Sequence, residues 1–385
     1  MNSTTKTNEM RLIIGADLVP TYSNEALFIR GDIEQLVGED IISYLKKSDF
    51  NIFNLEAPLT SSCHNIKKNG ICIKASEKCI AGYSSLGVDF LTLANNHILD
   101  YGEEGLEDTI CVLNEHNIKY AGVGKNLREL RKAHIEECDG RKVGIYCCVE
   151  HEFSVATEAS PGANPFEPLS IENDLKQLSD NCDYVIVLYH GGREHYRYPT
   201  PLLQKRCRKI VECGANLVVC QHSHCIGCEE EYNNGTIVYG QGNFIFDADN
   251  CDEWKTSMLI EVVDKKINYI PIVKQTELIR IADVEDKQKI LREFWQRSEQ
   301  IKNAEFVISE FKRYANESFY EYMWSICGGS ESFILRVINK LSNYRFYKWY
   351  IKKKLPSNVL TKLLNYFICE SHSEIIVESI KCRLS

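Results

Sequence analysis

The feature that most constrains the fold of this chain is a series of short apolar runs, each followed directly by a polar cluster. The runs are rich in β-branched residues, as buried strands are. Segments with helical periodicity lie between them, so the sequence predicts an α/β domain. Ligands in such folds bind at the carboxyl ends of the strands, which is where the polar clusters fall. The runs are residues 12–14, 50–53, 90–93, 184–189, 217–220 and 237–239.

Helices and loops between these runs follow from local patterns. Residues 103–116 carry apolar side chains at helical spacing. Residues 202–213 form a second helical pattern that stops before Gly214, a typical residue at the end of a helix. Residues 153–169 include three prolines and a glycine, so we expect a long loop there that could act as a lid over a substrate.

The pattern changes at about residue 275, which suggests a second region. Residues 279–314 are expected to be helical and amphipathic, Gly328 and Gly329 interrupt the helical pattern, and it then resumes. No stretch of about 18 apolar residues occurs, and the polar N-terminus does not resemble a signal peptide. The expected organisation is a disordered N-terminus at residues 1–10, an α/β domain at 11–275 and a mainly helical C-terminal region at 276–385.

Charge and cysteine content restrict the expected partners and compartment. The net charge is −9, although residues 280–385 hold 18 basic and 13 acidic residues, so the rest of the chain is strongly acidic. An acidic body argues against nucleic acid as a partner, because nonspecific binding needs a basic surface. The 17 cysteines are odd in number, which favours a reducing compartment and a cytoplasmic location. Cys225 and Cys228 lack the second pair that a zinc ribbon needs.

Histidines gather at the ends of the expected strands. Four of the ten histidines lie just past the end of an apolar run, and His222 and His224 would lie on the same side of an extended segment. Oxygen donors follow other runs, and a mixed set of nitrogen and oxygen donors suits zinc, manganese or iron(II). We therefore predict a site for one or two divalent metal ions. Its residues are Asp17, Glu56, Asn96, His97, His190, His222 and His224.

Each of these residues also has an ordinary structural explanation. A single Asp after a strand commonly forms a turn or caps a helix. The pair Asn95-Asn96 is typical of a loop. The metal prediction depends on all seven residues lying along one rim of the sheet, and not on any one of them.

Six segments of the chain resemble, in order, the motifs of the CapA family of capsule and poly-γ-glutamate synthesis proteins. The resemblance covers residues 11–275. The CapA family is similar in turn to the calcineurin-like metallophosphatases. It implies a four-layer α/β/β/α sandwich with a mainly helical C-terminal extension. The segments are IIGADLVP, FNLEAPLT, LANNHILDYGEEGLEDT, VLYHGGREHYRYPTP, GANLVVCQHSHCIGCEE and IVYGQGNFIFD.

The resemblance also implies roles for the residues of these motifs. Asp17 and His224 would bind a first metal, Asn96, His190 and His222 would bind a second, and Glu56 would bridge the two. His97 would be the general acid, with Asn96 and Glu194 as further catalytic positions. Glu194 would either be another ligand or orient an imidazole. Residues implied in substrate binding are Asn95, Arg193 and Asn243.

Three departures from the metallophosphatase or CapA motifs bear on this prediction. Val19 stands where metallophosphatases have a second ligand histidine, which weakens the first metal site. Glu56 replaces their bridging Asp, and Gly191 stands where CapA proteins often have Trp. A single metal at the second site is therefore as consistent with the sequence as a pair.

Three functions remain open at this point. The first is a hydrolase or transferase that acts on γ-glutamyl amide bonds, whose substrate would be an anionic polymer or a small molecule. The second is a metal-dependent phosphoesterase, which rests on the wider fold analogy. The third is a non-catalytic assembly subunit that keeps a metal or ligand site. Basic residues that could meet an anionic substrate are Arg193, Arg197, Lys74 and Lys125, although each can equally be a solvated surface charge.

The C-terminal region carries its own signal. From Ser332 to Cys369 there are eight basic residues and no acidic one, with aromatic residues interleaved. Such a segment could lie peripherally on an anionic membrane or contact a capsule-synthesis partner. Alternatively it is a helical subdomain with a solvated basic face and an aromatic stripe toward its core.

Overall fold

The computed structural model describes residues 10–127, 129–138, 140–246, 251–275 and 278–384. The chain divides into two compact units, one that ends at Ile308 and one that runs from Ser309. Apart from Met10, which is buried in the core, the expected disordered N-terminus lies outside the described residues.

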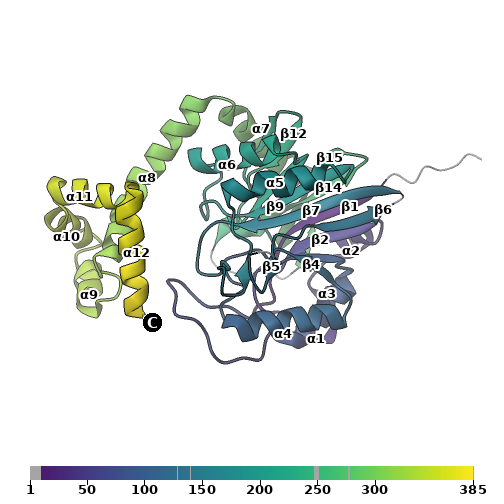
Figure 1. Ribbon diagram of the computed structural model, residues 1–385, viewed down its shortest axis with the longest axis horizontal. Coiled ribbons are helices and arrows are strands. Elements are labelled where there is room, and N and C mark those ends of the chain that lie inside the picture. Colours follow the sequence, from purple (N-terminus) through teal and green to yellow (C-terminus); the bar gives the residue numbers. More distant parts are fainter. Residues whose placement is uncertain (1–9, 128, 139, 247–250, 276–277, 385) are drawn as a thin grey trace, which may run out of the picture. The chain divides into compact units, whose positions relative to one another are not determined.

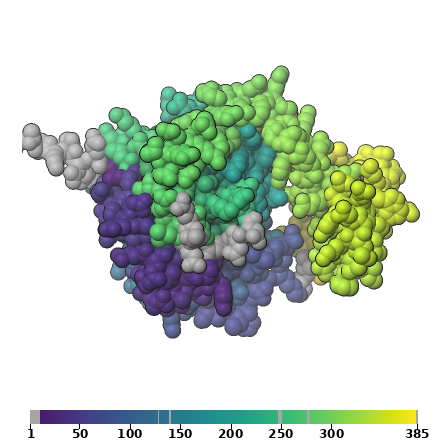
Figure 2. Space-filling model, turned by 180° about the vertical axis from the view of Figure 1, so that it is seen from behind, coloured from purple at the N-terminus to yellow at the C-terminus, as the bar shows by residue number. Residues whose placement is uncertain are grey.

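The first unit contains a mixed eight-stranded sheet, whose order is β16-β15-β14-β1-β2-β3-β4, with β13 also paired to β1. The strands β1 to β4 are parallel, whereas β14 to β16 are antiparallel. Figure 2 shows the purple N-terminal and green later segments side by side, as the pairing of β1 with β14 requires. The strands are β1 (Arg11–Leu18), β2 (Phe50–Asn54), β3 (Phe90–Thr92), β4 (Lys119–Ala121), β13 (Asn243–Ile245), β14 (Thr256–Val263), β15 (Lys266–Gln275) and β16 (Leu278–Ile281).

A second sheet has six strands in the order β11-β12-β10-β9-β7-β6, of which β7, β9, β10 and β12 are parallel. The short strands β5 (Val123–Gly124) and β8 (Gly162–Ala163) form a separate pair. All six predicted apolar runs are confirmed as strands of the two larger sheets. The strands of the second sheet are β6 (His134–Cys138), β7 (Arg141–Val149), β9 (Tyr184–His190), β10 (Leu217–Gln221), β11 (Glu229–Tyr232) and β12 (Gly235–Val238).

The two faces of the second sheet pack against two different hydrophobic cores. Ile186 and Leu188 of β9 belong to the core shared with the first sheet, whereas Val187 and Tyr189 pack with apolar residues of α5 and α6. Figure 1 shows α5 and α6 above the second sheet and α1, α3 and α4 beneath the first. The predicted α/β class and layered sandwich are confirmed. The helices are α1 (Glu25–Arg30), η1 (Ile33–Gln35), α2 (Glu39–Leu45), η2 (Glu77–Cys79), α3 (Ile80–Leu86), α4 (Gly102–Glu115), α5 (Pro168–Ser179), α6 (Pro201–Glu212) and η3 (Asp252–Lys255).

The first unit extends beyond the expected boundary at residue 275. Residues 279–281, which fall in the segment predicted to be helical, lie in β16, because they pair with the edge of β15. The helix α7 (Val284–Ile301) then packs Phe294 and Ile290 against Met258 of β14. The predicted helices at 103–116 and 202–213 are confirmed as α4 and α6.

The C-terminal unit is helical, as predicted, and the break at Gly328 and Gly329 separates α8 from α9. Several of its apolar side chains are exposed, among them Phe333 at 71% and Leu341 at 83%. Among the described residues, no helix is long and apolar enough to cross a membrane. The helices are α8 (Ala304–Ile326), whose first residues belong to the first unit, α9 (Phe333–Leu341), α10 (Phe346–Lys354), α11 (Ser357–Ile368) and α12 (Glu370–Leu384).

Candidate metal centre

Strand register brings the predicted site residues together. In the first sheet Asp17 lies opposite both Asn54 of β2 and Asn243 of β13. In the second sheet His190 lies opposite Gln221, the residue that ends β10 before the histidine loop. The carboxyl ends of parallel strands lie at one edge of a sheet, so the polar residues that follow the strands of both sheets lie close together at these edges.

The strongest convergence surrounds one nitrogen atom of His190. Its Nε2 lies 2.9 Å from Asn96 Oδ1, 3.1 Å from His222 Nδ1 and 3.3 Å from Glu56 Oε1. Ligand atoms that bind one ion at about 2.1 Å lie roughly 3 Å from one another. These four residues are the set that the resemblance assigns to a second metal with its bridging carboxylate.

A neighbouring group contains the residues assigned to the first metal. His224 Nδ1 lies 3.4 Å from Asp17 Oδ2 and 2.8 Å from Asn243 Oδ1. Candidate ligand atoms of Asp17, Glu56 and His190 all lie within 4.8 Å of one another, and so do those of Glu56, His222 and His224. Glu56 is common to both triads, which is the position of a bridging ligand.

The buried carboxylates lack the partners that burial normally requires. Glu56 is fully buried, and neither of its oxygens has a hydrogen-bond partner among the described residues. Asp17 is also fully buried, and its Oδ2 is likewise without a hydrogen bond. Buried carboxylate oxygens without hydrogen bonds are costly, so these three oxygens facing three imidazoles form a set that a divalent cation would complete. The residues present therefore fit a metal.

Electrostatics within the cluster point the same way. Burial lowers the pKa of His222 well below its usual value, and nearby His190 lowers it further, so this imidazole is neutral and can bind a metal. Burial alone would raise the pKa of Glu56, but His190 and His224 outweigh it and hold that pKa low. Burial and the Glu56 charge raise the pKa of Asp17.

The loop that carries His222 and His224 differs from the expected extended segment. β10 ends at Gln221, and both histidines have left-handed backbone conformations with φ of 86° and 52°. The prediction of side chains alternating along a strand is therefore wrong. The two rings still lie together, with centroids 5.9 Å apart, because the turn brings them to one side. Backbone strain of this kind is common at functional sites.

His97 lies beside the cluster with its own partners. Its Nδ1 is 2.7 Å from Asp100 Oδ2, and Asp100 also forms an ion pair with Lys68. The Lys68 and Asp100 side chains are 3% and 0% exposed, so this pair is shielded from water. Asp100 and Lys68, whose Nζ lies 3.1 Å from the same Nδ1, fix the orientation of the ring and leave Nε2 for proton transfer.

Comparison with known proteins agrees with the motif series. Residues 17–248, more than half of the chain, match the family model described as bacterial capsule synthesis protein PGA_cap. The chain belongs to this family. The capsule biosynthesis protein CapA of Bacillus anthracis is 30% identical over 213 residues, 53% of this chain and 52% of the relative. The PGA biosynthesis protein CapA of Bacillus subtilis (strain 168) is 27% identical over 251 residues, 60% of this chain and 66% of the relative.

The chain thus spans about half to two thirds of the length of these curated PGA_cap relatives. Solved structures similar to it include a phosphatase from Mycoplasma pneumoniae, at 15% identity and a TM-score of 0.42, which covers 73% of this chain and 97% of that one. Another is a 5′-nucleotidase precursor from Thermus thermophilus, at 13% identity and a TM-score of 0.41, which covers 75% and 58%. Both likenesses are weak, so neither assigns an activity to this PGA_cap protein.

The remaining predicted residues of this PGA_cap protein lie in different surroundings. Asn95 is fully buried, and its amide donates to Leu55 O at 2.7 Å and to Asn54 Oδ1 at 3.2 Å, so it supports the site from behind. No described contact joins the half-buried Glu194 to the cluster, and its catalytic role stays a prediction. Arg197 bonds Ile226 O at 3.2 Å.

The other basic candidates differ in burial and in their described contacts. Arg193 is half-buried, in the turn after β9. Lys74 donates to Ser62 O and lies 4.7 Å above the Tyr101 ring. Lys125 is exposed. The described contacts therefore tie Lys74 to local groups, and an anion-binding role for any of these residues stays a prediction.

Asn54, which is not among the residues predicted from the sequence, joins the two groups of donors. Its Nδ2 donates to Asp17 Oδ1 at 2.7 Å and lies 3.3 Å from His190 Nδ1. A group that orients metal ligands in this way commonly changes metal affinity when removed. The signal is present in the sequence, because Asn54 ends β2 and lies within the FNLEAPLT motif, two residues before Glu56. Lys68 and Asp100 were also missed.

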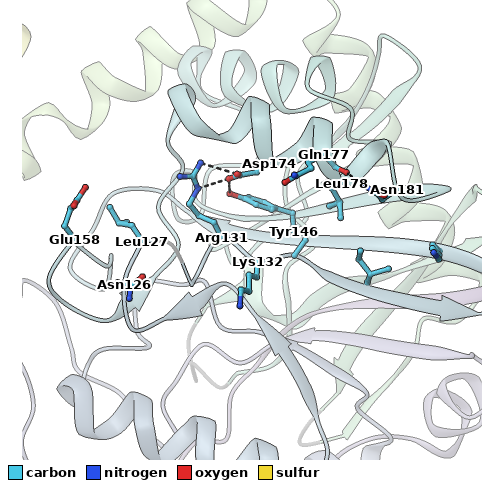
Figure 3. A pocket seen from close by; sticks show the side chains of 13 residues that line it. Asn126, Leu127, Arg131, Lys132, Tyr146, Glu158, Asp174, Gln177, Leu178 and Asn181 are labelled. Carbon is cyan, nitrogen blue, oxygen red and sulfur yellow. Dashed lines mark hydrogen bonds and ion pairs between the residues drawn. The ribbon is translucent and has the colours of Figure 1, made fainter.

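A separate cavity of about 1090 Å³ lies between α5 and the strands β6 and β7. Figure 3 shows Arg131 and Tyr146 directed at Asp174 in it, with Arg131 Nε 2.8 Å from Asp174 Oδ2. The residues that line it include none of the described donors of the metal cluster. This cavity is therefore distinct from the candidate centre.

The metal-free protein is expected to lose stability as pH rises, through His224. Burial lowers its pKa, but the Glu56 and Asp17 carboxylates outweigh burial and raise it to about 9. The unfolded value is about 6.5, so the stabilisation is complete below about pH 6.5 and is lost as pH rises through 9. Urea unfolding in EDTA, measured from below pH 6.5 to above pH 9, should show the free energy of unfolding falling with pH by about 3 kcal/mol more in the wild type than in His224→Gln. Equal falls in the two proteins would refute this role of His224.

Proposed function

We propose that this chain is a metal-dependent hydrolase or transferase of γ-glutamyl amide bonds in poly-γ-glutamate or capsule biosynthesis. The observation that carries the proposal is the convergence of Asn96, His222 and Glu56 on His190 Nε2, with His97 beside them. Membership of the capsule synthesis family supports the substrate class. The chemistry of the site supports the metal dependence.

A divalent ion held by such donors acidifies water and polarises the group under attack. Asp17, Glu56, Asn96, His190, His222 and His224 would hold it, and manganese, zinc and iron are the candidates.

The chain's own residues would supply the proton transfer. Water, or an amine in the transferase reaction, adds to the amide carbonyl carbon and releases a proton to solvent, from which His97 is later reprotonated, and the C–N bond then breaks. His97 gives the proton on Nε2 to the departing nitrogen, while Asp100 holds the ring in place through Nδ1. Asn54 holds both Asp17 and His190 in place through its side-chain amide.

A turnover assay on the metal-loaded protein tests this proposal. We expect release of glutamate or amine from γ-glutamyl peptides, dependent on added manganese, zinc or iron(II) and abolished by EDTA. Paranitrophenyl phosphates, assayed in parallel, test the phosphoesterase alternative. Metal bound tightly with no turnover of either substrate class would instead favour a non-catalytic assembly subunit. Turnover of paranitrophenyl phosphates alone, or metal binding with no turnover, would contradict the amide proposal.

We also propose that the C-terminal unit contacts an anionic membrane surface. Along α9 the apolar residues share one face, including Phe333, Ile334 and Leu341 at 71%, 68% and 83% exposure. Arg336 and Lys340 supply positive charge on the same helix. A basic amphipathic helix with an exposed apolar face suits a negatively charged lipid surface.

Vesicle co-sedimentation of the full chain tests this contact. The wild type should sediment with vesicles that contain phosphatidylserine more than with pure phosphatidylcholine. The double variant Phe333→Ser, Leu341→Ser should bind at least about tenfold more weakly, since each buried apolar side chain contributes about 1.5–3 kcal/mol. Tyr22→Ser, which changes a fully exposed ring in the first unit, is the matched control. Equal sedimentation of the double variant and the wild type would exclude the membrane contact.

A further inference from the structure

A second group of metal-binding side chains lies beside the main cluster. His195, Cys251 and Glu253 come from two loops, and their candidate ligand atoms all lie within 4.8 Å of one another. Cys251 Sγ is 3.2 Å from Glu253 Oε2 and 3.7 Å from His195 Nδ1. None of the three belongs to the set predicted from the sequence. An imidazole, a thiol and a carboxylate thus face one small volume.

The two loops are held in place by contacts with the main centre. The backbone N–H of His195 donates to Ser223 O at 2.8 Å, between the two histidines of the 222–224 loop. Trp254, in η3, stacks on the His195 ring at 6.2 Å and packs on the His224 ring at 4.9 Å. The position of Trp254 over His224 therefore depends on the contacts that hold residues 251–255 in place.

The donor types distinguish this group from the main cluster. The main cluster offers nitrogen and oxygen atoms, whereas Cys251 adds a sulfur atom, which favours zinc over manganese, calcium or magnesium. Three protein ligands with a fourth position open to water are a common zinc arrangement. His195 is exposed and the other two are partly exposed, so an ion can reach the site from solvent.

We propose that His195, Cys251 and Glu253 form a separate zinc site that fastens residues 251–255, and with them Trp254, over the main metal centre. When zinc binds, the Cys251 thiol releases its proton to solvent and the thiolate becomes a ligand. His195 contributes a ring nitrogen and Glu253 a carboxylate oxygen. The main cluster supplies no ligand to this ion, so the site exists whether or not the proposed hydrolysis is correct.

Cobalt(II) substitution of the full-length protein tests this site independently of catalysis. Cobalt bound by a thiolate gives an intense sulfur-to-cobalt charge-transfer band in the near ultraviolet, which a site of nitrogen and oxygen ligands cannot give. We expect this band in the wild type and in Cys182→Ser, a matched cysteine change on another surface. The band should disappear in Cys251→Ser, while cobalt still binds at the main cluster.

A second variant guards against misfolding of Cys251→Ser. Glu253→Gln keeps the thiol and the side-chain shape, and should lower the cobalt affinity measured from the same band by at least about tenfold. Absence of the band in the wild type, or its persistence in Cys251→Ser, would overturn the proposal. Unchanged affinity in Glu253→Gln would remove Glu253 from the site and also contradict it.

Discussion

The variant Glu56→Gln is expected to lose bound metal and, with it, all metal-dependent turnover. Glu56 is fully buried, belongs to both triads of candidate ligands, and has no hydrogen-bond partner for either oxygen among the described residues. Glutamine keeps the shape but removes the negative charge. Even groups that only support a ligand are worth about 10- to 100-fold in metal affinity, so loss of a shared ligand should exceed about 100-fold.

Elemental analysis after gel filtration measures this effect directly. Glu261→Gln is the control, because Glu261 is also a buried carboxylate of the first sheet but pairs with Arg11, away from the centre. We expect the control to retain the metal content of the wild type. If Glu56→Gln retained it too, Glu56 would not be a ligand and the proposed centre would have to be abandoned.

The variant His97→Ala should lose turnover while it keeps its metal. General acid catalysis contributes about 100- to 10,000-fold, and we expect a fall in kcat within that range. The physical reason is that His97 is oriented by Asp100 at 2.7 Å beside the cluster, yet no triad of candidate ligands among the described residues includes it. Steady-state kinetics on the substrate class that turns over, with metal content measured in parallel, separates a proton donor from a ligand.

His116→Ala provides the control for this variant, since His116 is exposed at the end of α4. Its kinetics should equal those of the wild type. Loss of metal together with turnover in His97→Ala would make His97 a ligand, and unchanged turnover would exclude it as the acid.

The fold was largely predictable because buried parallel strands leave a clear signal. The run at residues 184–189 is apolar without interruption, as a strand covered on both faces must be, and it forms β9. Polar residues directly after such runs have to lie at the strand ends. That is why Asp17, Glu56, Asn96, His190 and His222 could be grouped from the amino-acid sequence alone.

Parts that depend on loop conformation were not predictable. The turn at His222 and His224 is left-handed, which spacing along a chain cannot reveal. Lys68 reaches Asp100 from a distant loop, with no periodic pattern to connect them. His195 and Cys251 are separated by 56 residues and meet only because both loops pack near the 222–224 turn. The strand β16 falls within the segment predicted to be helical, because its short pattern also fits helical spacing.

Anomalous diffraction from crystals of the full-length protein grown with manganese tests most directly whether the residues of the main cluster bind a metal ion. We expect a strong peak at the manganese edge within bonding distance of Glu56, His190 Nε2 and His222, where the strand ends of both sheets meet. A map with no peak there, in crystals whose solution contains the ion in excess, would contradict it.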